Sequence, residues 1–334
     1  MTDLVRGGAR IAALSAAFLA GAVLSLQAWV NGRLGTEVHD GVAAAALSDG
    51  VGLLVLLLVC PLLPSFRAGV VRLAGALRTG AGRERLRPHQ FLGGLVGGVV
   101  VLSQGVSTSV LGAATYTVAL VGGQTLSGLW VDHFGLGPSG VSRITGRRVF
   151  GAVLAAAAVA VPLLGSIGSR SVWLAMLPLL GGIGLSWQMA VNGRLNVSAR
   201  TPWPAVTLNF LLAAVVLGVA LVVAGVRHGL PHHWPDRVGL YSGGLLGLLF
   251  VLASVLLVRR IGVLVTGLAM VAGQTLGALV VDALAPGGAS DGTAAVLTSL
   301  TVLLAAALAA QAPTATARFT SDRNLHPETE PSAP

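Results

Sequence analysis

Ten long apolar runs limit what this chain can fold into more than any other feature of its sequence. Crossing a hydrocarbon core of roughly 30 Å takes about 20 apolar helical residues. Runs of that order cover residues 11–31, 42–63, 91–109, 111–131, 148–166, 172–191, 203–226, 238–258, 261–281 and 293–311. Membrane strands are disfavoured because the runs are continuous instead of alternating, whereas helices satisfy their own backbone hydrogen bonds in lipid. The sequence therefore predicts an all-α integral membrane protein with ten transmembrane helices.

The composition agrees with a chain whose main solvent is lipid. Hydrophobic residues make up 54% of it and charged residues 10%, and the mean hydropathy is +0.83. All 21 basic residues are arginine, and the bias toward Ala, Gly, Val, Leu and Arg is that of a GC-rich genome more than of a selected basic surface. We therefore expect no nucleic-acid partner. The single cysteine, Cys60, lies in an apolar run and has no partner for an internal disulfide.

A short motif occurs twice, each time at the end of an apolar run. Gln, three further residues and Asn-Gly-Arg-Leu occur in "QAWVNGRLG" from residue 27 and again in "WQMAVNGRLN", 161 positions later. A longer alignment supports the repeat, because residues 93–135 match 243–285 without a gap, with 16 of 43 positions identical. The offset between the copies is 161 at the short motif and 150 in this longer alignment. The first half therefore has 11 extra residues between the two regions, most simply in its Arg-rich loop.

The chain is therefore predicted to be one five-helix unit duplicated. Residues 11–166 form the first repeat and 172–311 the second, between a cytoplasmic N-terminal segment of residues 1–10 and a disordered cytoplasmic tail of residues 312–334. An odd number of spans in each repeat inserts the second upside down relative to the first, as in many secondary transporters. The two copies of the motif should then end on opposite faces of the membrane.

The first apolar run has a second interpretation as a cleaved signal peptide, because Arg6 and Arg10 precede it. The second copy of the motif closes an internal run, where signal peptidase could not act. Since both copies should have the same structural role, we favour a retained first helix.

Arginine placement predicts the orientation, because Lys and Arg concentrate in cytoplasmic segments. With the N-terminus inside, 17 of the 21 arginines fall on the cytoplasmic side, which leaves Arg33, Arg170, Arg227 and Arg237 outside. Both termini are therefore expected in the cytoplasm. The loop at residues 65–90 interleaves arginines with apolar residues, which suits either a surface helix on anionic lipid headgroups or a solvated loop that sets topology.

The paired motifs resemble those of a known family. Each half has a Q-x3-N-G-R-L end to its first helix and a later helix written "GGQTLSGLWVDHFG" or "AGQTLGALVVDALA". Over about residues 11–311 the chain resembles the YdcZ-like family of the drug/metabolite transporter superfamily. The resemblance implies a ten-helix transporter in the inner (plasma) membrane, with a path for a small-molecule substrate between its halves. Asp49 departs from the pattern, since an uncharged residue is expected there.

Asp49 is the one ionisable residue that the predicted spans place well inside a helix. A carboxylate there is costly and tends to persist where it faces a polar path or a partner. It could take up and release a proton during transport, so Asp49 is the candidate for proton coupling. In the alternatives, the helix starts nearer Gly50 and Asp49 is interfacial, or Asp49 pairs with Arg33.

Several amides and hydroxyls are candidates for lining the path. Gln27 and Asn31 share a helix face, as do Gln188 and Asn192, and such amides either bind substrate or tie helices together. Asn209 is the counterpart of Ser48 in the second half. The duplicated pairs Gln124–Thr125 and Gln274–Thr275 are expected in the cytoplasmic and outer halves of their spans, respectively. The complete set of path candidates is Gln27, Asn31, Gln124, Thr125, Gln188, Asn192, Asn209, Gln274 and Thr275.

Other features favour structural roles. Asp132 and Asp282 fall at the water interface, where terminal acids need no special function. Glycines such as Gly93, Gly97 and Gly247 form small-xxx-small ridges, which suit close helix packing or a sliding surface. His228, His232 and His233 could bind zinc with Asp236, but their loop is short and contains two prolines, so no metal or cofactor is expected.

Transport is favoured by the inverted duplication and by sparse polar residues that are confined to a few helices.

 A membrane-embedded enzyme would need converging nucleophile, base or metal groups, and no HExxH, GxSxG or paired intramembrane His or Glu is present. A scaffold protein with no path remains a second alternative, which only a flux measurement separates from a transporter. The sequence also leaves open whether two copies pair as a homodimer.

Overall fold

A computed structural model describes residues 2–79, 86–138, 169–231 and 233–284, together with residues 140–141, 145–146, 149–150, 153–154, 157, 300–301 and 304. All regular elements in these ranges are helical. Seven helical segments there are long and apolar enough to cross a membrane: Gly8–Val38, Gly41–Leu62, Pro88–Ala113, Trp173–Ala199, Trp203–Arg227, Val238–Ile261 and Val265–Leu284. The predicted spans 148–166 and 293–311 and the predicted tail 312–334 fall almost entirely outside the described residues.

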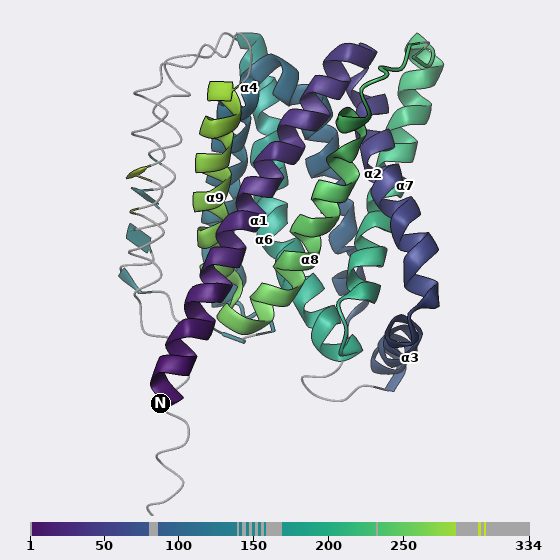
Figure 1. Cartoon of the computed structure of the whole chain (residues 1–334). Helices are drawn as coiled ribbons and strands as arrows, with labels where there is room; N and C mark the ends of the chain where they lie inside the picture. Colours follow the sequence, from purple (N-terminus) through teal and green to yellow (C-terminus); the bar gives the residue numbers. More distant parts are fainter. Residues whose placement is uncertain are drawn as a thin grey trace, which may run out of the picture.

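The long helices lie side by side along one bundle (Figure 1). In chain order they are α1 (Thr2–Val38), α2 (Gly41–Val59), α3 (Pro64–Thr79), α4 (Gly93–His133), α6 (Ser169–Ala199), α7 (Trp203–His228), α8 (Gly243–Ile261) and α9 (Val263–Leu284). Short 3-10 turns precede or follow three of them: η1 (Cys60–Leu62), η3 (Pro88–Leu92) and η4 (Val238–Ser242). The N-terminal end of α1 and the short helix α3 lie at the same end of the bundle (Figure 1).

α4 is a helical hairpin and not one straight helix. Gly112 has φ 77° and ψ 161°, which no α-helix contains. The Tyr116 hydroxyl contacts the Ser103 hydroxyl at 3.0 Å and donates to the Val100 carbonyl at 3.3 Å. In a straight helix, Val100 and Tyr116 would be about 24 Å apart, so the chain must fold back at Gly112. The predicted spans 91–109 and 111–131 correspond to these two arms.

The second arm, residues 113–133, is not among the seven segments that are long and apolar enough to cross a membrane. It carries Gln124, Thr125 and Asp132, which lower its hydropathy. Burial between neighbouring helices compensates, because Gln124 and Thr125 are both almost fully buried. This arm therefore faces protein at the positions where lipid would be unfavourable.

The backbone repeats where the sequence aligns. Gly262, between α8 and α9, has φ 83° and ψ 167°, and it is the counterpart of Gly112 at the offset of 150. Both glycines adopt a conformation that is strained for a residue with a Cβ. The α8–Gly262–α9 unit is thus the second-half equivalent of the α4 hairpin.

The backbone also repeats where the sequence does not. The Asn-Gly-Arg-Leu motifs were expected to end their helices, but α1 continues to Val38 and α6 to Ala199. Each helix then ends at a non-glycine residue with positive φ, 58° at His39 and 57° at Arg200. These two positions are 161 apart, the offset of the motif, and such left-handed residues terminate helices by bonding back to the last turn. The predicted helix end was therefore about one turn too early.

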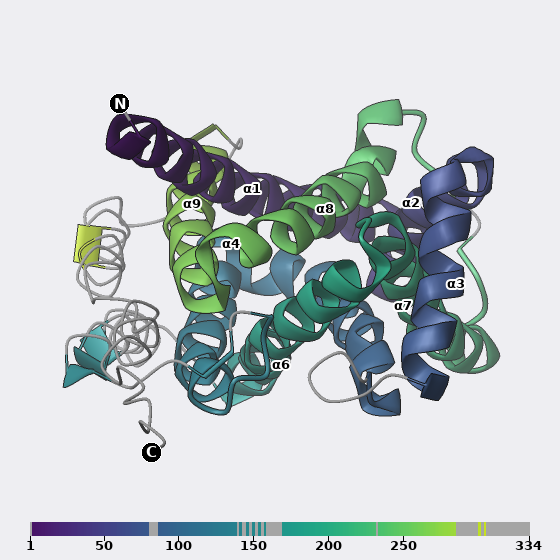
Figure 2. The ribbon, with the colours of Figure 1, turned by 90° about the horizontal axis from the view of Figure 1, so that it is seen from below.

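The first helix of each half packs against the hairpin of the other half. α1 lies against α8 and α9, and α6 lies against both arms of α4 (Figure 2). A Cβ at Gly21 of α1 would overlap the Met270 carbonyl, and a Cβ at Gly182 of α6 would overlap the Leu120 carbonyl. Gly182 is the counterpart of Gly21, and Leu120 that of Met270.

Glycines of the hairpins approach the backbones of the first helices in the same way. A Cβ at Gly273 would overlap the Phe18 carbonyl, and a Cβ at Gly123 would overlap the Leu179 carbonyl. Reciprocal contacts of this kind, in which i meets j and the equivalent of j meets the equivalent of i, are those of a self-complementary two-fold interface. Glycine is required at these positions because the two backbones are in direct contact.

α3 lies across one end of the bundle, at an angle to the long helices (Figure 2). Leu73 is buried with Leu86, Leu195 and Ala199, and the Arg72 Nη1 donates to the Ala199 carbonyl at 3.0 Å. Val71 remains 72% exposed on the other side. α3 is therefore an amphipathic helix fixed to the end of α6, and its contact with anionic headgroups stays a prediction.

We predict that Gly21→Ala and Gly182→Ala each lower the free energy of unfolding by about 1–3 kcal/mol, because the new methyl group displaces a backbone. Gly50→Ala is the matched control, since a Cβ there meets nothing within 4 Å. In a helix, this control should be neutral or stabilising by up to about 1 kcal/mol. Thermal unfolding in detergent micelles measures all three variants. Equal melting temperatures for Gly21→Ala and Gly50→Ala would contradict the close approach of α1 to α9.

Candidate functional site

A small cavity lies between the halves, lined by residues of α1, α2, α4, α6, α7 and α8. Its polar side chains are Gln27, Asp49, Gln188 and Asn209, four of the residues that the sequence selects. It offers about 30 Å³ of space for water-sized molecules, enough for roughly two waters and too little for a metabolite. We call this the central cavity.

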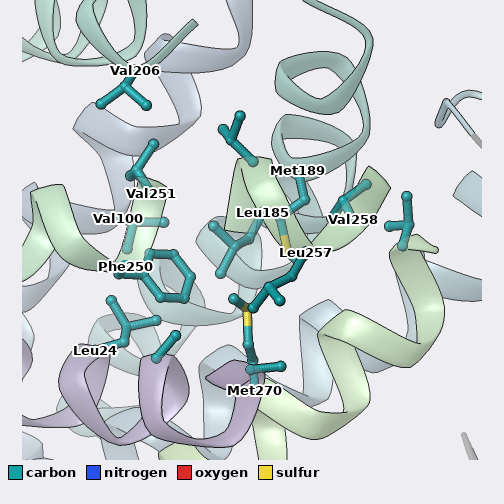
Figure 3. Close-up of a cluster of buried hydrophobic side chains, with 14 of the residues drawn as sticks. Leu24, Val100, Leu185, Met189, Val206, Phe250, Val251, Leu257, Val258 and Met270 are labelled. Carbon is teal, nitrogen blue, oxygen red and sulfur yellow. The ribbon is translucent and has the colours of Figure 1, made fainter. Parts of the chain in front are cut away.

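The remaining wall of the central cavity is apolar. Leu24, Val100, Leu185, Phe250 and Val251 line it, and Figure 3 shows these side chains converging from α1, α4, α6 and α8. All five are at least 94% buried and belong to the main hydrophobic core. The polar groups are therefore held on an otherwise dry and rigid surface.

Asp49 lies nine residues after the helix cap Asp40, which is about 14 Å along the axis of α2. Its side chain is 3% exposed, and its Oδ2 has no hydrogen-bond partner among the described residues. α2 begins at Gly41, well before Gly50, and no ion pair joins Asp49 to Arg33 in the part of the chain described. Arg33 instead lies over the Trp29 ring, 6.0 Å from its centroid. Asp49 therefore lies buried in the wall of the central cavity, on a helix that starts before it.

The amides of the second half form a bonded set. Gln188 Nε2 and Asn192 Nδ2 both donate to the Asn209 Oδ1, each at 2.9 Å. Gly97 allows this approach, since a Cβ there would lie 3.0 Å from Asn209 Nδ2 and 3.4 Å from Gln188 Nε2. α6 and α7 are therefore tied together at the cavity, in the helix-tying role considered for such amides.

The equivalent groups of the first half are less well satisfied. Asn31 Nδ2 donates to the Gln104 Oε1 at 2.7 Å. Within the described residues, no partner is recorded for Gln27 Oε1, Asn31 Oδ1 or Ser48 Oγ. Ser48 occupies the position of Asn209 but is too short to accept from both amides. The two halves thus share a backbone and differ in how their polar atoms are paired.

Gln124 and Gln274, expected in opposite halves of their spans, are in direct contact. Gln274 Nε2 donates to the Gln124 Oε1 at 3.4 Å, and both side chains are at most 2% exposed. Because each glutamine is the counterpart of the other, their contact joins equivalent positions of the two halves. The surrounding space, about 10 Å³, is too small for more than one water.

The hydroxyls next to these glutamines are also satisfied internally. Thr125 Oγ1 donates to the Val121 carbonyl and Thr275 Oγ1 to the Val271 carbonyl, each at 2.8 Å. Ser186 and Ser25 donate to the main-chain carbonyls of Gln124 and Gln274, at 2.8 and 2.6 Å. The hydroxyls of this second polar cluster are thus bonded within the protein, whereas Gln274 Oε1 has no recorded partner among the described residues.

Several residues outside the central cavity have structural partners. Arg194 donates to the Leu136 and Gly135 carbonyls, at 2.7 and 2.6 Å, and so closes the end of α4. No group of three or more metal-binding side chains occurs within the described residues, and His232 lies outside them. Gln104, which supports Asn31, was missed from the sequence. Its position inside an apolar run could have revealed it.

A comparison with known protein families shows which family this chain belongs to. A family model described as "Putative inner membrane exporter, YdcZ" matches residues 12–161 and 173–313. The chain belongs to this family. It is therefore a multi-pass membrane transporter of the YdcZ family, within the drug/metabolite transporter superfamily. No curated protein matches the chain.

The contact between Gln124 and Gln274 predicts an energetic coupling. In a double-mutant cycle of Gln124→Leu and Gln274→Leu, the interaction energy should be about 0.6–1 kcal/mol, as found for side-chain hydrogen bonds between membrane helices. Thermal unfolding of the four proteins in detergent measures it. Gln124→Leu paired with Thr207→Val is the control, because the Thr207 hydroxyl contacts Cys60 and shares no recorded contact with Gln124. Strict additivity for the glutamine pair would contradict the contact.

Proposed function

We propose that this protein exports a small solute by alternating access between two inverted five-helix halves, ten helices in all, and that Asp49 couples the cycle to protons. The observation that carries the proposal is the reciprocal packing of α1 and α6 around the central cavity. In inverted-repeat transporters the substrate site lies near the bilayer midplane at the interface of the repeats. The central cavity is lined by residues of both α1 and α6, which supports a substrate site there.

The helix directions support inversion. α1 starts at the end of the bundle where α3 lies, whereas α6 finishes there, because Ala199 is bonded to Arg72 of α3 (Figure 1). The hairpin turns favour the same arrangement. Gly137 packs against Val263, next to the Gly262 turn, and it follows an arm about 31 Å long that starts at Gly112. The two turns therefore belong to opposite ends of the bundle.

The size of the central cavity suits a closed state. About 30 Å³ admits waters but no metabolite, so substrate entry requires the halves to separate on one side. Small residues at the interface favour such rocking, because backbones in contact slide without interlocked side chains. α1 would move with the second-half hairpin and α6 with the first.

Asp49 suits proton coupling because it is the charged residue among the buried side chains of the described chain. It faces a cavity that can hold water, and α2 packs against α1, α4, α7, α8 and η4. The titratable and charged groups described on these elements are Arg10, Arg33, Glu37, Tyr116, Asp132, His133, Arg227, Arg259, Arg260 and Tyr241. Most lie near helix ends, Tyr116 is bonded within α4, and none forms a recorded ion pair with Asp49.

Topology provides the first test, in a Cys60→Ala background. A membrane-impermeant maleimide should label Glu37→Cys, near the end of α1, from outside intact cells. Arg200→Cys, just after α6, should be labelled only in inside-out vesicles, because inversion puts the two helix ends on opposite faces. Labelling of both positions from the same side would overturn the inverted arrangement.

Flux provides the second test. Proteoliposomes loaded with a cell extract should release at least one metabolite faster under a proton gradient, as read by mass spectrometry. Asp49→Asn should abolish the gradient-dependent part while membrane insertion stays intact, because an amide cannot exchange the proton. Asp40→Asn is the control, since Asn caps α2 as well as Asp does. Unchanged gradient dependence in Asp49→Asn would remove Asp49 from coupling, and no release by the wild type would favour the scaffold alternative.

A further inference from the structure

We propose that the central cavity recognises the ammonium group of a primary amine with a small apolar body. This assignment of a substrate class rests on the proposed transport function and concerns the same site. The ammonium would donate its three N–H groups to Asp49 Oδ2, Gln27 Oε1 and Gln188 Oε1.

Among the fully buried polar atoms of the cavity lining, those left without a recorded partner in the described structure are oxygens. Of its lining side chains, Gln27, Asp49 and Gln188 each contain a buried oxygen with no recorded partner in the described structure. The fourth polar side chain, Asn209, already accepts two hydrogen bonds on its Oδ1. The unpartnered donor Gln104 Nε2 belongs to a side chain that does not line the cavity. Buried polar groups normally find partners, so the missing partner of each of these three oxygens is a donor.

Hydrogen bonding fixes which atom Gln188 presents. Its Nε2 donates to the Asn209 Oδ1 at 2.9 Å, so turning the amide over would place two oxygens against each other. The oxygen of Gln188 is therefore left as an acceptor. Gln27 is held where a Cβ on Gly247 would lie 2.7 Å from its amide nitrogen, and glycine at that position makes room for the side chain.

The charge of the site favours a cation over a neutral donor. Asp49 is 3% exposed and has no recorded ion-pair partner in the described residues. A buried charge is stable only when it is paired, and hydrogen bonds between ionised partners are about twice as strong as neutral ones. An ammonium supplies both the opposite charge and three donors.

The apolar wall selects against a bare metal ion. A hard cation takes about six oxygen ligands, whereas three unpartnered oxygens line this cavity in the described structure. Leu24, Val100, Leu185 and Phe250 form the opposite surface and suit a hydrocarbon body (Figure 3). The present volume fits the amine head group, and the body requires the opening that transport itself demands.

The probes are phenethylamine and two analogues of the same shape, 2-phenylethanol and 3-phenylpropionate. We expect phenethylamine to raise the melting temperature of the detergent-solubilised full-length protein and to bind in equilibrium dialysis. The alcohol lacks the charge and the carboxylate has the opposite charge, so neither should do so. N,N,N-trimethylphenethylammonium, which has the charge without N–H donors, should bind at least several-fold more weakly than phenethylamine.

Asp49→Asn should weaken phenethylamine binding about tenfold to a hundredfold, the loss expected for hydrogen bonds to a charged group. Gln27→Leu should weaken it less, because one neutral acceptor is lost. Asp40→Asn makes the same chemical change nine residues earlier on α2 and outside the cavity lining, so its affinity should match that of the wild type. The comparison of analogues on the wild type needs no variant and holds even where Asp49→Asn fails to fold.

Equal binding of phenethylamine and 2-phenylethanol would overturn the proposal, as would stabilisation by NaCl that exceeds stabilisation by the amine. Failure of the transport proposal gives a different pattern: phenethylamine binds in an Asp49-dependent manner, and proteoliposomes release neither it nor any extract metabolite. Release of other metabolites without amine binding would leave transport standing and remove the amine assignment.

Discussion

Backbone contact between each first helix and the hairpin of the other half holds this structure together. Between membrane helices, lipid provides no hydrophobic driving force, so association depends on close packing and hydrogen bonds. Gly21 and Gly182 place α1 and α6 directly on opposing carbonyls, and Gly273 and Gly123 return the contact. Neither half is complete alone, because its first helix is packed in the other. The polar residues brought to this junction are consequently enclosed by both halves.

The two halves have equivalent backbones but different polar side chains at the central cavity. Asn209 accepts from two amides in the second half, while its counterpart Ser48 leaves the first-half amides partly unpaired. Phe210 is likewise the counterpart of Asp49. Symmetry in the backbone would supply the two arrangements on which the proposed alternating access depends. Departure from symmetry in the side chains supplies a site with one orientation and one charge.

Much of the fold could be predicted from the sequence, because lipid imposes length and hydropathy on every span. Seven predicted spans have helical segments of spanning length, and the offsets of 161 and 150 recur in the backbone angles of His39, Arg200, Gly112 and Gly262. The site was predicted only in part. Helix periodicity put Gln27 and Asn31 on one face, but it could not place the partners across the interface. The contact between Gln124 and Gln274 was not predicted for that reason, since depth within a span does not reveal which helices meet.

Asp49 links the two proposals through a physical exclusion. A carboxylate oxygen that carries a proton cannot also accept from an ammonium, and the central cavity is too small to hold a second cation elsewhere. Proton and amine would therefore occupy the site in turn. An exchanger needs no more than this, provided that the halves rock only when the buried carboxylate is neutralised, because an unpaired charge is costly to carry through a closed, dry interface. On this view, the single acidic side chain in the cavity wall sets both the substrate charge and the coupling.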